Sequence, residues 1–321
     1  MCKIMVMSGI NNTNRKLAWE FTKQMAMQLS PGNSDGLGYA AVTTDGELFG
    51  ERWHKNSEAF VERPAPIASS EEELDIAKKY GGMLIPEVKP IRYNKFGVIN
   101  EDAVAAITLH TRMATSGKEF INTHPFVRGG TSLIHNGVIG NARDLEMIQS
   151  TCDSEAILNL YVKHNVTNNI GNIQRVADKL QGYYACGVIT ETKKYGYVVD
   201  VFKDDRARLS AAYIRDMNIL VFSTSLDDIL TVCNKMGMEV AHKYSVKAGV
   251  ITRLSTLTGN PLETAKFTPE FKAPKEIKSS KKKETPEVNG EYISRWSEDY
   301  WETTETDSKN YLQFPQRWRR K

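Results

Sequence analysis

Residues 110–141 read HTRMATSGKEFINTHPFVRGGTSLIHNGVIGN, and this stretch decides the fold. It contains Arg112, whose guanidinium suits a carboxylate because it binds two oxygens at once. An isolated arginine, however, more often forms a surface ion pair. The pair Asn136-Gly137 is a strong hairpin-turn signal. An Asn side chain and a Gly backbone N–H are also donors that stabilise an oxyanion. Both interpretations of the pair remain open at this point.

The same stretch contains three histidines, which raise the question of a metal site. His110, His124 and His135 lack the close i, i+4 spacing of zinc-binding helices. We therefore predict core or hydrogen-bonding roles for them, with no bound metal and no cofactor. Cys186 and Cys233 also fit a core.

Working outward, the next informative residue is Cys2. Removal of Met1 would place a thiol and a free α-amine on one residue. The pKa of an α-amine is about 7.7–8.0, so a useful fraction is neutral near pH 7 and acts as a base. Nucleophile and base on one residue define N-terminal nucleophile chemistry. The competing interpretation is an incidental small residue that only permits removal of Met1.

Three sequence blocks downstream of Cys2 carry a resemblance. H-T-R-x-A-T-x-G, N-x-H-P and H-N-G-x-I-x-N occur in the order and at the spacing of the class II glutamine amidotransferases. That family includes glucosamine-6-phosphate synthase and glutamine phosphoribosylpyrophosphate amidotransferase. Further blocks similar to the family lie at 34–38, 152–155, 180–185 and 222–225. The resemblance covers residues 2–255 and implies an α+β fold, a four-layer αββα sandwich of two antiparallel sheets.

The resemblance also implies a role for each site residue. Cys2 would attack the glutamine side-chain amide and form a thioester, with Asn136 and Gly137 as the oxyanion hole. The residues implied to bind or border the substrate are Arg112 at its carboxylate, Asp153 at its ammonium, Met113 and Thr115. An ordinary helix N-cap is the alternative for Asp153. Cys152, beside Asp153, fits inert burial better than reactivity.

Two positions depart from the family pattern. Lys3 stands where the family usually has Gly, so its side chain is expected either to crowd Cys2 or to add a positive charge beside it. Met113 replaces the more usual aromatic residue after the arginine. Neither departure removes a reacting group, but together they leave altered activity or a degenerate site open.

Composition restricts the class of protein further. The chain has no apolar run near the ~20 residues of a membrane span and no secretory signal. Four cysteines without C-x-x-C spacing favour a reducing, cytoplasmic setting. The chain has 42 basic residues (Lys and Arg) and 39 acidic residues (Asp and Glu). From residue 265 onward there are 13 basic and 10 acidic residues, which leaves 29 of each in residues 1–264. A neutral body argues against nucleic-acid binding.

Hydrophobic periodicity predicts the order of secondary structure. We expect the first strand at the N-terminus and a helix from about 13 to 31. A strand at 36–42 should be followed by a hairpin turn at 44–46. The further strands expected are 104–111, 132–135, 183–190, 195–202, 219–223 and 249–254. The further helices expected are 142–150, 153–164, 172–180 and 226–236, besides an acidic helix near 69.

Residues 256–321 read as a charged, tryptophan-containing tail that is largely disordered. Its aromatics among charges suit docking on a partner, while folding back onto the domain is the alternative. No second enzymatic domain is expected after 255, so ammonia from glutamine would pass to a separate synthase. The oligomeric state stays open. Two alternative functions remain, an N-terminal-cysteine acylase acting on another amide and a retired scaffold that serves as an interaction protein.

Overall fold

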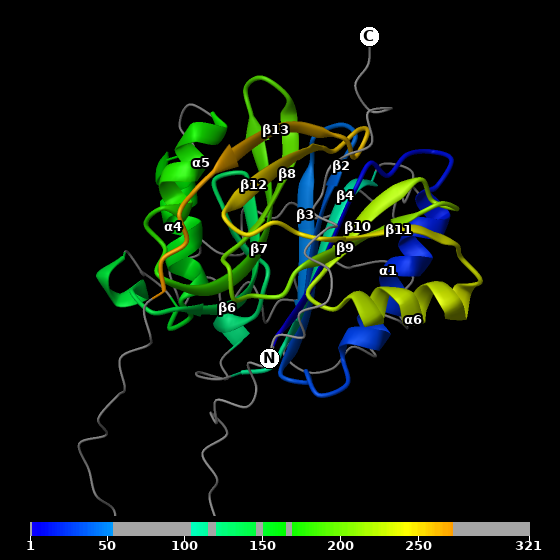
Figure 1. Ribbon diagram of the computed structural model, residues 1–321, viewed down its shortest axis with the longest axis horizontal. Helices are drawn as coiled ribbons and strands as arrows, with labels where there is room; N and C mark the ends of the chain where they lie inside the picture. The colour runs from blue at the N-terminus through cyan, green and yellow to red at the C-terminus, as the bar shows by residue number, and fades with distance from the viewer. Residues whose placement is uncertain (1, 54–103, 115–119, 146–149, 165–168, 272–321) are drawn as a thin grey trace, which may run out of the picture.

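The computed structural model describes residues 2–53, 104–114, 120–145, 150–164 and 169–271. Two β-sheets lie face to face, with helices on the outer side of each (Figure 1). The first sheet has the strand order β11-β9-β10-β1-β4-β2-β3. Its members are β1 (Lys3–Ser8), β2 (Gly36–Thr43), β3 (Leu48–Trp53), β4 (Val104–Arg112), β9 (Ser210–Ile214), β10 (Ile219–Ser223) and β11 (Val240–Ser245).

The second sheet has the order β13-β12-β8-β7-β6-β5. Its members are β5 (Phe126–Arg128), β6 (Thr131–Ile139), β7 (Gly182–Thr192), β8 (Gly196–Lys203), β12 (Val250–Ser255) and β13 (Pro261–Lys266). Each pairing between neighbouring strands is antiparallel in both sheets. The predicted pair of antiparallel sheets is therefore confirmed.

The helices form the two outer layers. Apolar side chains of α1 (Arg15–Leu29) and α6 (Leu226–Met236) pack on the first sheet, and those of α4 (Ser154–His164) and α5 (Ile170–Ala177) pack on the second. Two single 3-10 turns, η2 (Phe120–Asn122) and η3 (Ala142–Asp144), lie in connections. The predicted four-layer αββα sandwich is confirmed.

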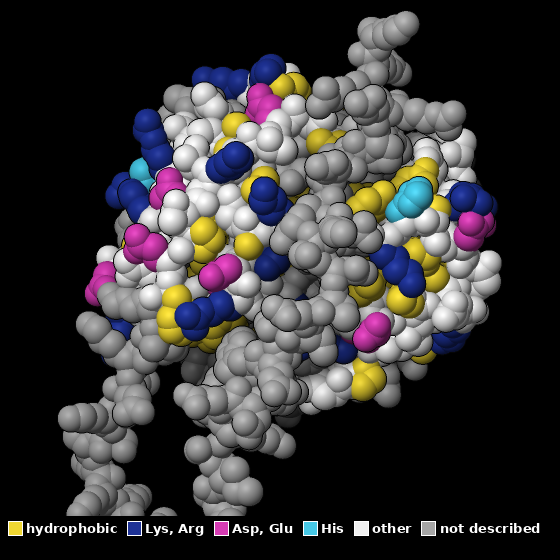
Figure 2. Space-filling view, viewed as in Figure 1, with side chains coloured by type: hydrophobic (Ala, Val, Ile, Leu, Met, Phe, Trp, Pro, Cys, Tyr) yellow, Lys and Arg dark blue, Asp and Glu magenta, His cyan; other side chains and the backbone are white. Residues whose placement is uncertain are grey.

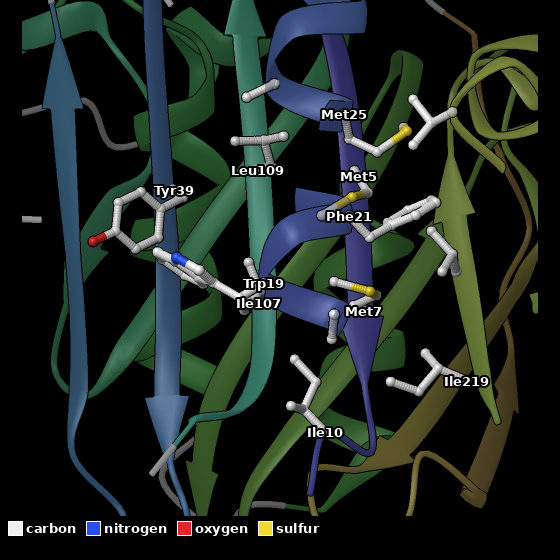
Figure 3. Close-up of a cluster of buried hydrophobic side chains, with 14 of the residues drawn as sticks. Met5, Met7, Ile10, Trp19, Phe21, Met25, Tyr39, Ile107, Leu109 and Ile219 are labelled. Atoms are coloured by element: carbon white, nitrogen blue, oxygen red, sulfur yellow. The ribbon is translucent and has the colours of Figure 1, made fainter. Parts of the chain in front are cut away.

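The side chains of strand β1 point alternately to the two faces of the sheet and so contribute to two different hydrophobic cores. Met5 and Met7 face α1 and pack with Phe21 and Met25 (Figure 3). Ile4 and Val6 point the other way, into the core between the two sheets. Successive side chains of a strand face opposite sides of its sheet, so a strand buried on both faces is apolar throughout. Every residue of β1 after Lys3 is buried.

A buried ion pair joins the last strands to the fold. Arg253 on β12 donates two hydrogen bonds of 2.8 Å to Asp200 on β8. Tyr161 of α4 also donates to this carboxylate. Arg253, Asp200 and Tyr161 are fully buried, and Glu263 of β13 lies 3.5 Å from the same guanidinium. A bidentate geometry of this kind compensates the desolvation of both charges.

The structure corrects the predicted domain boundary at residue 255. Strand β13 pairs with β12 along most of its length, and Phe267 packs in the core beneath α5. The chain at Glu270 still hydrogen-bonds to β7, where Gly182 N–H donates to its carbonyl at 2.8 Å. Residues 256–271 therefore belong to the fold. The rest of the predicted tail, 272–321, lies outside the described residues.

Several local predictions are also revised. Strands β9 and β11 form where no strand was predicted. Where a helix was expected at 142–150, the structure has a single 3-10 turn at Ala142–Asp144, and residues 146–149 lie outside the described residues. The acidic helix predicted near residue 69 lies outside the described residues. In the part of the chain that is described, no helix is both long enough and apolar enough to cross a membrane. Acidic and basic side chains are interspersed on the face shown in Figure 2.

Candidate functional site

Cys2 lies at the entrance to β1, at the end of the first sheet where β4 also ends. Its position in the alternation of β1 matches that of Ile4 and Val6, so it belongs to the side that faces the second sheet. Its Sγ lies 3.5 Å from the carbonyl oxygen of Met113, just beyond β4. The thiol is thus presented at the mouth of the inter-sheet layer, half-buried and without a disulfide partner.

The charges around the thiol come from two separate sequence blocks. Burial raises the pKa of Cys2, the positive charge of Arg112 lowers it, and the negative charge of Asp153 raises it. The interactions show that residues far apart in sequence lie near one sulfur atom. Reactivity of this thiol would require a base, because burial favours the protonated form.

Arg112 is the last residue of β4 and is buried. Its backbone position is held by Asp35, which precedes β2. The N–H of Asp35 donates to the Arg112 carbonyl at 3.1 Å, and the Asp35 carboxylate accepts from Ala114 N–H at 2.8 Å. This clamp holds the segment that includes Met113, whose side chain is 41% exposed. Thr115, predicted to border the substrate, lies outside the described residues.

Asn136 and Gly137 lie inside β6 and not in a hairpin turn. Their neighbours across the sheet are Ala185 and Tyr184 of β7. Gly137 has a φ of +148°, and a Cβ added there would lie 2.0 Å from the carbonyl oxygen of Tyr183. Only glycine allows so close an approach of two strands. The turn interpretation of Asn-Gly is therefore wrong here, since the glycine serves close strand contact.

Asp153 immediately precedes α4 and contacts β6. Its Oδ2 accepts a 2.6 Å hydrogen bond from Ile139 N–H, two residues beyond Gly137. One carboxylate oxygen lies 4.0 Å from Nδ1 of His135. Asp153 therefore ties the start of α4 to the strand that carries Asn136 and Gly137. Its side chain retains 23% exposure, so a substrate can still reach it.

The three histidines form a buried hydrogen-bonded cluster around Ser154. The Ser154 hydroxyl lies 2.8 Å from His124 Nε2 and 2.9 Å from His135 Nδ1. His110 stacks on His124 and lies 3.2 Å from the backbone carbonyl of His135. Burial lowers the pKa of all three, that of His110 to about 3, so they are neutral near pH 7. Their predicted core and hydrogen-bonding role is confirmed.

The remaining cysteines also take the places expected of them. Cys186 and Cys233 are buried in the apolar cores. Cys152 lies 3.3 Å from the Ser154 hydroxyl, and burial raises the pKa of its thiol to about 12. Such a thiol is protonated at neutral pH and is a poor nucleophile. In the described ranges, no three His, Cys, Asp or Glu side chains are grouped as a metal site would require.

Two residues near the site were not singled out from sequence. Ser154 joins His124 to His135 directly after Asp153. Burial raises the pKa of Tyr183, at the start of β7, and the charges of Asp153 and Cys2 raise it further. The block at 180–185 marks Tyr183 as part of a family landmark, although the sequence alone does not indicate which way its ring points.

Comparisons with known proteins agree with this architecture. No family model matches the chain. Over 92 residues it is 34% identical to the glutamine–fructose-6-phosphate aminotransferase [isomerizing] of Acinetobacter baylyi, which covers 25% of this chain and 15% of that protein. The B. subtilis glutamine phosphoribosylpyrophosphate amidotransferase, complexed with ADP and GMP, matches with a TM-score of 0.55 and 16% identity. A structure of the allosteric regulatory enzyme of purine biosynthesis gives 0.56 and 16%.

Each of these two structural matches covers 84% of this chain and 50% of the other chain, so the chain spans half or less of the proteins it resembles. The chain shares the fold of these two structures, and Cys2 stands at the start of a central strand of that fold. The sequence relatives confirm the likeness to glutamine amidotransferases predicted from the motifs, over stretches that cover 25% and 28% of this chain.

Proposed function

We propose that the chain hydrolyses glutamine to glutamate and ammonia through a thioester on Cys2. The observation that carries this proposal is the convergence of residues from two separate sequence blocks on one thiol. Met113 approaches the sulfur through its carbonyl, and the charges of Arg112 and Asp153 act on its ionisation. Asp153 in turn is hydrogen-bonded to β6 beside Gly137.

The chemistry follows from groups on a single residue. After removal of Met1, the neutral α-amine of Cys2 takes the thiol proton, and the sulfur attacks the side-chain amide carbon of glutamine. The C–N bond breaks, the proton passes to the departing nitrogen, and ammonia leaves a thioester. Water then attacks the thioester, which releases glutamate and restores the thiol. An oxyanion forms in both steps and would be stabilised by Asn136 and Gly137.

The two ends of glutamine require opposite charges. Arg112 would bind the α-carboxylate, because its buried guanidinium offers two parallel donors near the thiol. Asp153 would bind the α-ammonium, since its carboxylate lies at the start of α4 beside β6 and its negative charge acts on the thiol. Met113 and Thr115 would border the substrate between them. The neutral histidine cluster lies behind this site and would hold Asp153 and β6 in place.

The domain that performs this reaction would comprise residues 2 to about 271, the corrected extent of the fold. We propose that a separate synthase accepts the ammonia, since glutamine amide transfer is common to the relatives. Residues 272–321 are the proposed docking segment for that partner. All four cysteines are free, which suits a reducing compartment such as the cytoplasm.

The test is a direct assay of purified protein whose intact mass shows removal of Met1. Incubation with glutamine should release glutamate and ammonia in equal amounts, and a glutamine-mimicking electrophile should label Cys2 alone. The matched control is Cys152→Ala, which removes the neighbouring thiol and should retain activity. Glutaminase activity in Cys2→Ala would exclude the proposed nucleophile. Hydrolysis of other amides without glutamine would favour the acylase alternative, and a retained Met1 would favour the retired scaffold.

A further inference from the structure

The residue after the proposed nucleophile takes part in a three-element tether on the helix side of the first sheet. Lys3 Nζ donates to Asp228 Oδ2 of α6 at 2.8 Å. The other carboxylate oxygen, Oδ1, accepts from Gln28 Nε2 of α1 at 3.0 Å. The Asp228 side chain is only 9% exposed and that of Lys3 31%. A single carboxylate thus connects β1, α1 and α6 one residue away from Cys2.

The direction of the Lys3 side chain follows from strand alternation. Lys3 shares the face of Met5 and Met7, which pack against α1, whereas Cys2 shares the face of Ile4. The lysine therefore does not crowd the approach to the thiol. Its ammonium group is hydrogen-bonded to Asp228 on the opposite face of the sheet from the site, so it is not placed to bind the substrate carboxylate.

The tether is needed most at this end of the strand. Once Met1 is removed, no residue precedes Cys2, and its position depends entirely on the residues that follow. Ile4 is held by Thr224, through its N–H to Thr224 Oγ1 at 3.1 Å and its carbonyl to Thr224 N–H at 3.2 Å. Lys3 is in register with Thr111 of β4. The Lys3 side chain supplies the last anchor before the nucleophile.

The surroundings of Asp228 favour the ionised form of its carboxylate. Burial alone would raise its pKa, but the hydrogen bonds donated by Lys3, Gln28 and Ser225 lower it below its ordinary value. The carboxylate therefore stays ionised and paired at neutral pH. A glycine at position 3, usual in the family, would provide no such side-chain anchor.

We propose that Lys3 and Asp228 are positioning residues that hold the first residue of β1 so that the Cys2 thiol faces the Arg112 and Asp153 end of the site. The proposal rests on the proposed glutaminase function. Misplacement of a reacting group by about 1 Å can cost ~100-fold in rate, so loosening one anchor is expected to lower kcat by about tenfold. KM should change little, because the groups proposed to bind glutamine are untouched.

The experiment compares Lys3→Met, Asp228→Asn and the double variant, each checked by intact mass for removal of Met1. Both single variants should lose about tenfold in kcat, with KM within about twofold. The kcat of the double variant should be no lower than that of the slower single variant, since each single variant already removes the same interaction. Lys3→Arg should recover most of the rate. The matched control is Lys23→Met, which breaks the exposed Lys23–Glu20 pair of α1 and should leave kcat unchanged.

Three results would overturn the proposal. A Lys3→Met enzyme with full kcat would do so, even if it melted at a lower temperature, because the tether would then be structural only. A raised KM with unchanged kcat would instead place Lys3 at the substrate. If the fold losses in kcat of the two single variants multiplied in the double variant, Lys3 and Asp228 would act separately.

If wild-type protein hydrolyses no glutamine, the proposed function fails, and the tether is then tested by alkylation of Cys2 with iodoacetamide. Release of the half-buried thiol in Lys3→Met should speed alkylation several-fold, because burial raises the pKa of the tethered thiol. Equal alkylation rates in wild type and Lys3→Met would refute the tether independently of activity.

Discussion

Replacing Gly137 by alanine tests the close approach of β6 and β7 at the proposed oxyanion site. A Cβ at this position would lie 2.0 Å from the Tyr183 carbonyl oxygen, where real contacts are not shorter than 3.0 Å. The strands must separate by about 1 Å, and the strain of the positive φ adds to the clash. Overpacking costs about 1–3 kcal/mol and an unfavourable backbone conformation about 1–3 kcal/mol. We therefore expect Gly137→Ala to lose about 2–6 kcal/mol of unfolding free energy.

The same displacement should lower kcat/KM for glutamine by about 100-fold, the scale of a 1 Å misplacement. Thermal unfolding and steady-state kinetics measure the two effects. Gly196→Ala is the matched control, because Gly196, the first residue of β8, also has a positive φ, of +67°, yet nothing lies within 4 Å of an added Cβ. If Gly137→Ala matched this control in melting temperature and kcat/KM, the clash argument would be refuted.

Three further predictions concern binding, pH and the C-terminal segment. Arg112→Lys keeps the charge but loses the bidentate fork, so KM for glutamine should rise by a factor equivalent to about 2–3 kcal/mol. Asn136→Ala should instead lower kcat by about 100-fold. An unchanged KM in Arg112→Lys would contradict the assignment of Arg112 to the substrate carboxylate. The folded state lowers the pKa of His110 to about 3 from the ordinary 6.5, so the unfolded state binds more protons below pH 6.5. The free energy of unfolding should therefore fall by about 2 kcal/mol between pH 7 and pH 5 because of this residue. A urea midpoint that did not shift with pH would contradict this prediction. Truncation after Phe271 should retain glutaminase activity and melting temperature but abolish co-purification of a synthase. Truncation after Ser255 removes β13 and should destabilise the protein. Equal melting temperatures of the two truncated proteins would contradict the role of β13.

The fold was predictable from sequence where strands are buried on both faces. Residues 4–8 and 104–109 are continuous apolar or small-residue runs, and both lie in central strands of the first sheet. The missed strands lie at sheet edges or beside them. Strand β11 (VAHKYS) has no buried residue, and β13 (PLETAK) begins with proline and alternates between half-buried and exposed residues. Such edge strands are formed by pairing with a neighbour, which local sequence does not reveal.

The sequence suggests the residues of the candidate site but not their geometry. The sequence blocks lead to the proposal of Arg112, Asn136 and Asp153, because those residue types suit the chemistry. The direction of Lys3 depends on which face of β1 meets α6, and that is a property of the assembled layers. Asn136-Gly137 looked like a turn because the preference for turns is local, whereas the strand pairing that overrides it comes from β7.

The central place of β1 has a consequence for how the protein is made. Both neighbours of this strand, β4 and β10, lie far downstream in the chain. A nascent chain therefore emerges with β1 unpaired, and both edges of this strand are covered only after Ile219–Ser223 has been synthesised. The N-terminal end would stay open to an aminopeptidase during that interval. Under the proposed function, Met1 would thus be removed before the domain closes around Cys2.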